Sequence, residues 1–264
     1  MANCLNCGNQ ITENFCSNCG QKKYKRIDKK YIWDELQYTV FHTNKGLLYS
    51  IKTTLKNPGK TAKDFIEGNR VNHYKPILLV FVLSGIATFL TFKVLNFKEI
   101  MANYFSQQKI NSNLSTDMIS LMSSYNSLLM LLLIPIFALF TKIAFRKWGH
   151  NYYEHVVMNA YILTFYTLVS IIFVYPILFL FRHSPNIFFG LTQATMLLIP
   201  FILTWFFKGF YDDKPLKSII TRVFGIMGLT ILGYIILTIL IVVLVFVYAS
   251  INGPEVLQHV NNQK

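Results

Sequence analysis

Long apolar stretches alternate with short polar loops over most of the chain. Five of them are apolar on every face of a helix and long enough to cross about 30 Å of hydrocarbon. They cover residues 76–97, 121–145, 156–181, 187–207 and 223–249, and none contains Asp or Glu. A soluble helical bundle would carry polar residues at helical period instead. The pattern predicts an all-α polytopic membrane protein with about five transmembrane helices over residues 76–250, followed by a short polar tail, 251–264.

The chain ahead of the first apolar stretch has an amphipathic pattern. Apolar residues recur at helical spacing over residues 32–41 and 47–55, with lysines on other faces of the second stretch. A further helix is predicted after Asn57, which can cap it, with Pro58 in its first turn and Gly68 at its end. We expect these juxtamembrane helices to lie on the cytoplasmic leaflet or to pack against the ends of the spans. With a basic run at residues 22–30, they form a linker region, 22–75.

Four cysteines lie in the first 19 residues and none in the rest of the chain. Cys4 and Cys7 form one Cys-x-x-Cys-Gly knuckle, and Cys16 and Cys19 form a second. Four thiolates at this spacing close a tetrahedral site, so residues 1–21 are predicted to be a zinc ribbon with one structural zinc ion. The alternative is a redox dithiol pair, but such motifs normally sit on a βαβ scaffold, which this segment lacks.

Composition and charge support the membrane prediction and give it an orientation. Hydrophobic residues make up 53% of the 264 residues and charged residues 14%, and the mean hydropathy is +0.40. Residues 1–75 and the loops after the second and fourth spans hold 20 of the 25 Lys and Arg residues. The positive-inside rule therefore predicts a cytoplasmic N-terminus and a periplasmic C-terminus. Zinc-binding thiolates need a reducing compartment, which gives the same side for the N-terminus.

Several motifs in this order resemble one protein family. They are the doubled cysteine knuckle, Asn57-Pro58-Gly59, Gly68-x-Arg70, Tyr74-x-Pro76, and Glu154-His155 at the start of the third span. The chain resembles a family of uncharacterised bacterial membrane proteins, domain of unknown function 3667, common in Bacteroidetes. The resemblance implies a multi-pass protein of the bacterial inner membrane with an N-terminal zinc ribbon. The family has no established activity, so the resemblance implies no reaction.

Four polar residues near the predicted cytoplasmic face are candidates for binding a ligand or a lipid headgroup. They are Arg70, His73, Glu154 and His155. A charge at this depth needs a partner or water, so we expect a salt bridge between Arg70 and Glu154 that docks the first and third spans. A site for a headgroup or small anion, and an active or second metal site, are the alternatives. No nucleophile motif or paired carboxylates accompany the histidines, so we expect no enzyme.

The leading functional hypothesis is a non-enzymatic inner-membrane protein that acts in scaffolding, sensing or partner recruitment. Its expected partners are anionic lipid headgroups and a cytosolic or membrane protein. The net charge of +13 follows from the basic loops, so nucleic acid is not an expected partner. The alternative is a transporter, channel or lipid-handling protein whose ribbon is a regulatory or assembly domain. A mid-membrane cavity lined by Asn126, Tyr161, Tyr166 or Gln193 would favour this alternative, whereas solid packing there would favour the scaffold.

Overall fold

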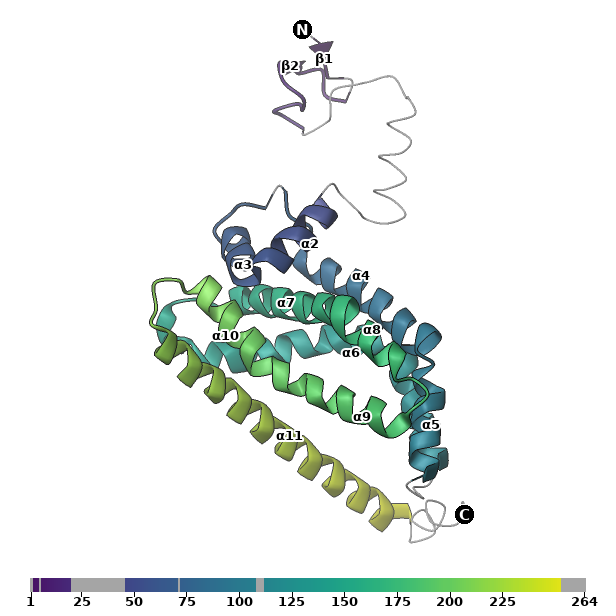
Figure 1. Cartoon of the computed structure of the whole chain (residues 1–264). Coiled ribbons are helices and arrows are strands. Elements are labelled where there is room, and N and C mark those ends of the chain that lie inside the picture. Colours follow the sequence, from purple (N-terminus) through teal and green to yellow (C-terminus); the bar gives the residue numbers. More distant parts are fainter. Residues whose placement is uncertain (1, 5, 20–45, 71, 108–111, 253–264) are drawn as a thin grey trace. The chain divides into compact units, whose positions relative to one another are not determined.

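The structure, a computed structural model, describes residues 2–4, 6–19, 46–70, 72–107 and 112–252 (Figure 1). Contacts divide the chain into two units, Met1–Asn44 and Lys45–Lys264, and each is treated by itself below. The basic run at 22–30, the helix predicted at 32–41 and residues 253–264 of the polar tail lie outside the described residues.

The first unit contains a short hairpin. Strand β1 (Ala2–Asn3) pairs antiparallel with β2 (Gln10–Ile11), and Ala2 lies opposite Ile11. Within the described part of this unit, the buried cluster consists of Cys4, Ile11 and Cys16. A core of this size cannot stabilise a fold by apolar burial alone.

The second unit is helical and confirms the predicted polytopic architecture. In the described part of the chain, five helical segments are long and apolar enough to cross a membrane: Pro76–Val94, Ser123–Ala144, Tyr152–Leu180, Pro185–Phe210 and Leu216–Val243. The first consists of α4 (Pro76–Phe89) and a π-helical turn (Leu90–Val94), the second lies in α6 (Ser112–Ala144), and the fifth lies in α11 (Leu216–Asn252).

The third and fourth spans are each built from two helices. The third joins α7 (Tyr152–Val169) through a π-helical turn (Ser170–Val174) to α8 (Tyr175–Leu180). The fourth joins α9 (Pro185–Ala194) through a 3-10 turn (Thr195–Leu198) to α10 (Ile199–Phe210). A short 3-10 turn (Arg146–Trp148) precedes α7, and α5 (Phe97–Gln107) follows the first span. The hydropathy pattern did not predict α5.

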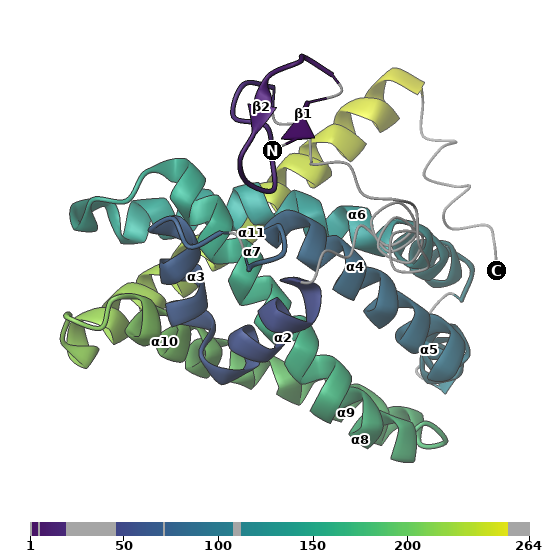
Figure 2. The ribbon, with the colours of Figure 1, turned by 90° about the horizontal axis from the view of Figure 1, so that it is seen from above.

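Two short helices pack against the ends of the spans (Figure 2). In α2 (Gly46–Lys56), one apolar face packs on the buried residues Tyr74 and Leu79; its side chains are Leu47, Ile51 and Leu55. In α3 (Pro58–Ile66), Ala62 is part of the main core of the unit. The apolar faces of both helices therefore meet protein, which is the second of the two arrangements expected from the sequence.

The start of α3 crosses α10 at very short range. Asn57 caps α3 as predicted, and its side-chain oxygen accepts a hydrogen bond from the Lys60 N–H at 2.9 Å. A Cβ on Gly59 would lie 2.0 Å from the Phe206 carbonyl oxygen, and a Cβ on Gly209 would lie 2.4 Å from Asn57 Oδ1. Only glycine at both positions permits this crossing.

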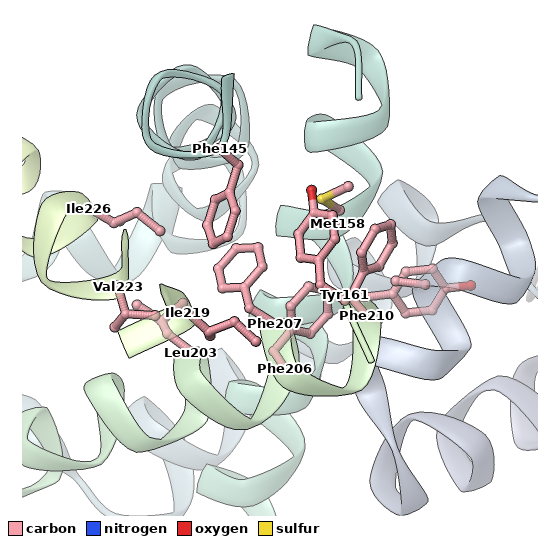
Figure 3. Close-up of a cluster of buried hydrophobic side chains, with 12 residues drawn as sticks. Phe145, Met158, Tyr161, Leu203, Phe206, Phe207, Phe210, Ile219, Val223 and Ile226 are labelled. Carbon is pink, nitrogen blue, oxygen red and sulfur yellow. The ribbon is translucent and has the colours of Figure 1, made fainter. Parts of the chain in front are cut away.

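The main core lies where α6, α7, α10 and α11 meet (Figure 3). Phe145, just after α6, points toward Phe207 of α10, and the ring centroids are 4.3 Å apart. Met158 and Tyr161 come from α7, and Ile219 comes from the first turn of α11. A second buried cluster joins the end of the first span and α5 to α8 and α9; its members are Leu95, Ile100, Met101, Leu178 and Phe188. The third span therefore contributes to both of these clusters, and its Leu168 also belongs to the cluster around Tyr74 and Leu79.

Candidate functional site

The four cysteine sulfurs gather at one point. All four Sγ atoms lie within 4.8 Å of one another, with Cys4 and Cys19 at 3.5 Å and Cys7 and Cys16 at 3.6 Å. These separations exclude disulfides, whose sulfurs are about 2 Å apart. They suit zinc, because four sulfurs at about 2.3 Å from one ion lie about 3.8 Å from each other. The donors and their spacing are compatible with one closed tetrahedral zinc site.

The first knuckle explains how its two cysteines come together. The Cys4 N–H donates to the Asn9 carbonyl, and the Gly8 N–H donates to the Cys4 carbonyl, both at 2.8 Å. Gly8 has a φ of +74°, a conformation that glycine adopts readily and other residues rarely do. The equivalent Gly20 of the second knuckle lies outside the described residues.

The neighbouring thiols favour the protonated form of Cys7. The Asn9 backbone N–H lowers the pKa of Cys7, but the neighbouring thiol of Cys19, together with desolvation and Cys16 and Cys4, outweighs this and raises it to about 11. A divalent cation would reverse this balance, because metal binding releases the thiol protons. Metal affinity at this centre is therefore expected to increase with pH.

The predicted docking pair does not form. Arg70 is exposed, and its Nε donates to the Phe65 carbonyl oxygen at 3.1 Å, at the end of α3. The Glu154 carboxylate accepts from the Asn151 N–H at 2.7 Å, and the Asn151 side chain accepts from the Glu154 N–H at 3.0 Å. The expected Arg70–Glu154 salt bridge is thus wrong. Helix ends leave backbone N–H and C=O groups unpaired, and such groups lie close in sequence to Arg70 and to Glu154. Each of these side chains therefore hydrogen-bonds a nearby backbone group instead of the other side chain.

The two histidines of the candidate set are buried in separate places. His73 is 8% exposed and packs edge-on against Tyr49, with ring centroids 5.0 Å apart. His155 is fully buried, and its ring centroid is 6.5 Å from that of His150. None of the four ring nitrogens of His73 and His155 has a hydrogen-bond partner among the residues that the structure describes. Burial lowers the pKa of His73, with only partial opposition from the charge of Asp64, so its imidazole is neutral near pH 7.

Several polar contacts near the same end of the bundle were missed by the sequence reasoning. Lys63 of α3 pairs with Asp212, after α10, at 2.9 Å, and both side chains line a polar cavity of about 470 Å³. Arg222 of α11 donates to the Ala144 carbonyl oxygen at 2.6 Å and lies over the Trp148 ring at 4.3 Å. These partners are 149 and 78 residues apart in the sequence, and no local pattern connects them.

A second cavity of about 470 Å³ lies between the spans. It is lined by residues of α6, α7, α10 and α11 and of the 3-10 turn before α10, and the lining contains no Asp, Glu, Lys, Arg or His. Of the four residues named as a possible mid-membrane lining, Tyr166 lines it. Tyr161 is fully buried in the main core, and Asn126 donates to Thr88 Oγ1 at 2.7 Å between α6 and α4.

Comparisons with known proteins found one match. Neither the curated proteins nor the solved structures gave a match to the chain. Residues 44–88, which cover α2, α3 and most of α4, match a family model. This segment contains the capped start of α3 at Asn57, the Gly59 crossing, and Arg70 at the end of α3. Over residues 44–88 the chain therefore carries the sequence pattern of the family described as Protein of unknown function (DUF3667), which confirms the family resemblance.

Proposed function

We propose that this chain is a non-enzymatic protein of the bacterial inner membrane whose N-terminal zinc ribbon recruits a protein partner at the cytoplasmic face. The observation that carries the proposal is the cluster of four cysteine sulfurs on a chain that also has five membrane-spanning segments. Cys4, Cys7, Cys16 and Cys19 would hold the zinc ion. A closed four-thiolate site has no open coordination position, so its role is to hold the ribbon folded.

A folded ribbon on a membrane-anchored chain suits recruitment. Anchoring confines the ribbon to the membrane surface, which raises its effective concentration toward other membrane-bound components. The basic residues of the linker region and of the loops on the same side support attachment to anionic headgroups, each contributing about 1 kcal/mol near the surface. Neither the ribbon nor the basic residues would need to catalyse a reaction for this recruitment.

The alternative, a transporter, channel or lipid-handling protein, meets one of its criteria, because Tyr166 lines the cavity between the spans, but transport receives less support. The cavity between the spans has no acidic or basic lining residue, and such residues mark most ion and proton pathways through membranes. Nor do the described residues place Arg70, His73, Glu154 and His155 in one cluster. We therefore do not assign a transport path.

The experiment compares the wild-type chain with the Cys7→Ser/Cys19→Ser double variant. Both are expressed at equal levels in the native host, crosslinked, and purified in mild detergent. Partners recruited by the ribbon should be recovered with the wild type and be reduced at least tenfold with the double variant, which keeps all five spans. A reporter that is active only in the cytoplasm, fused before residue 30, tests whether the N-terminus lies on the cytoplasmic side of the membrane. Identical partner sets for both chains would contradict recruitment by the ribbon, and a silent reporter would contradict the orientation.

A further inference from the structure

The cavity between α6, α7, α10 and α11 is apolar with one polar wall. Most of its lining is aliphatic or Met, and the polar lining residues are Thr141, Asn159, Tyr166 and Thr230. Its volume of about 470 Å³ lies in the range of small-molecule binding pockets. Apolar cavities stay dry and take up apolar ligands, and the helices around this cavity are spans, so its contents come from the bilayer.

Asn159 gives the cavity a directional hydrogen-bonding group. It is 6% exposed, and its Nδ2 donates to Thr141 Oγ1 and to the His155 carbonyl oxygen, both at 2.8 Å. Two good acceptors fix which end of the amide is the nitrogen. The other end, Oδ1, receives no hydrogen bond from any described residue. The residue is nine-tenths buried, but Oδ1 is not among the fully buried atoms that lack a partner, so this oxygen is accessible from the cavity and can accept a hydrogen bond from a ligand that donates an O–H.

Thr141 cannot supply that donor. Its hydroxyl hydrogen is directed to the carbonyl oxygens of Phe137 and Ala138, at 3.0 and 3.1 Å. The Thr230 hydroxyl is likewise directed to the Ile226 carbonyl oxygen at 2.9 Å. The free acceptor is therefore left to whatever occupies the cavity.

The depth of the cavity residues in the membrane follows from their positions along the helices. Thr141 lies one turn before α6 ends at Ala144, and Asn159 lies two turns after α7 begins at Tyr152. The lining reaches Met130, eleven residues and about 16 Å along α6 from Thr141, roughly half the thickness of the hydrocarbon. The Thr141–Asn159 pair is thus near one membrane face, while Tyr166, Thr230 and the apolar remainder of the lining lie deeper, so a ligand whose hydroxyl binds Asn159 would direct its apolar chain toward the membrane centre.

We propose that this cavity binds a single uncharged aliphatic amphiphile with a hydroxyl group, such as a long-chain alcohol or a monoacylglycerol, whose O–H donates to Asn159 Oδ1. The absence of charge in the lining excludes a phosphate or carboxylate from the cavity. Because Asn159 Oδ1 can only accept a hydrogen bond, it favours a ligand that ends in a hydroxyl group over one that ends in an ester or a hydrocarbon. This site is separate from the recruitment role proposed for the ribbon.

The test uses monoolein and methyl oleate, which share one acyl chain and differ in the free hydroxyl groups. The full-length protein is purified in mild detergent and stripped of bound lipid, and binding is measured by native mass spectrometry and by the shift in melting temperature. We expect one monoolein per chain, bound about five- to tenfold more tightly than methyl oleate, the value of about one hydrogen bond. Equal binding of the two probes would overturn the assignment of a hydroxyl ligand.

Two pairs of variants locate the site. Thr230→Trp fills the cavity and should abolish monoolein binding, whereas Leu232→Trp, on the same helix and 52% exposed, should not. Asn159→Leu should remove the preference for monoolein over methyl oleate, whereas Asn126→Leu, which breaks a similar Asn–Thr bond outside the cavity, should keep it. If Thr230→Trp does not fold, Asn159→Leu still decides. Unchanged preference in Asn159→Leu, or unchanged binding in a folded Thr230→Trp, would contradict the proposal.

Discussion

Replacing Gly59 with Ala places a methyl group where α3 crosses α10. The added Cβ would lie 2.0 Å from the Phe206 carbonyl oxygen, 2.6 Å from the Phe210 nitrogen and 2.8 Å from the Gly209 carbonyl carbon. All three are backbone atoms, so no side-chain rotation relieves the clash. Ordinary contact begins at 3.4 Å, so the two helices must separate by about 1.4 Å.

This separation would disturb the main core as well as the crossing. Ala62, one turn further along α3, is fully buried in that core and would lose contacts when α3 moves. Overpacking typically costs about 1–3 kcal/mol, and we expect the upper end because the contact is backbone against backbone. For a unit of this size, a loss of about 3 kcal/mol lowers the melting temperature by about 6–12 °C.

The matched control is Gly85→Ala. Gly85 lies inside α4, and a Cβ there would meet no atom within 4 Å. Alanine is a better helix former than glycine by about 0.5–1 kcal/mol, so this variant should be at least as stable as the wild type. Both variants are melted in the same detergent, followed by tryptophan fluorescence. A Gly59→Ala melting temperature equal to that of Gly85→Ala would refute the close crossing of α3 and α10.

Three further outcomes are expected. The wild type should contain about one zinc ion per chain and the Cys7→Ser/Cys19→Ser variant none, measured by elemental analysis, and full retention of zinc in the variant would exclude these ligands. Because burial lowers the pKa of His73 below 6.5, the unfolded chain binds the proton more tightly, and stability should fall as the pH drops through about 6.5 toward the lower folded pKa. His73→Leu should reduce the dependence of melting temperature on pH in this range, and an unchanged dependence would show that other groups cause it. Glu154→Ala should lower the free energy of unfolding by about 0.5–2 kcal/mol, because the capping box is lost. In the Arg70→Ala/Glu154→Ala double variant the two losses should add, and a coupling energy above about 0.5 kcal/mol between the two substitutions would indicate an ion pair after all.

Hydropathy was enough to find the five spans, and the Asn57-Pro58 pair was enough to find the capped start of α3. A span must hide about 20 residues of backbone in lipid, so its sequence signal is long and nearly independent of its neighbours. The cap at Asn57 is a local arrangement of the same kind, because the donor and acceptor are three residues apart. The cysteine cluster was also predictable, since its ligand spacing is local within each knuckle.

The contacts between different spans could not be predicted from the sequence in this way. The Arg70–Glu154 pair was expected from charge and depth, but each group found a backbone partner within five residues. The crossing at Gly59 and Gly209 depends on two segments 150 residues apart, and neither glycine is unusual in its own helix. The free acceptor of Asn159 follows from the direction of its amide, which the sequence does not contain.

The π-helical turn at Ser170–Val174 divides the third span into two registers. A π-helical turn holds one residue more than an α-helical turn, so the helix beyond it is rotated by about 100° relative to an uninterrupted α-helix. Tyr161 faces the main core before the turn, and Leu178 faces the second cluster after it. A single-residue deletion within 170–174 would remove this offset and turn Leu178 away from its cluster while leaving the first half of the span in place. Homologues of different length at this position would therefore differ in how α8 meets α5 and α9.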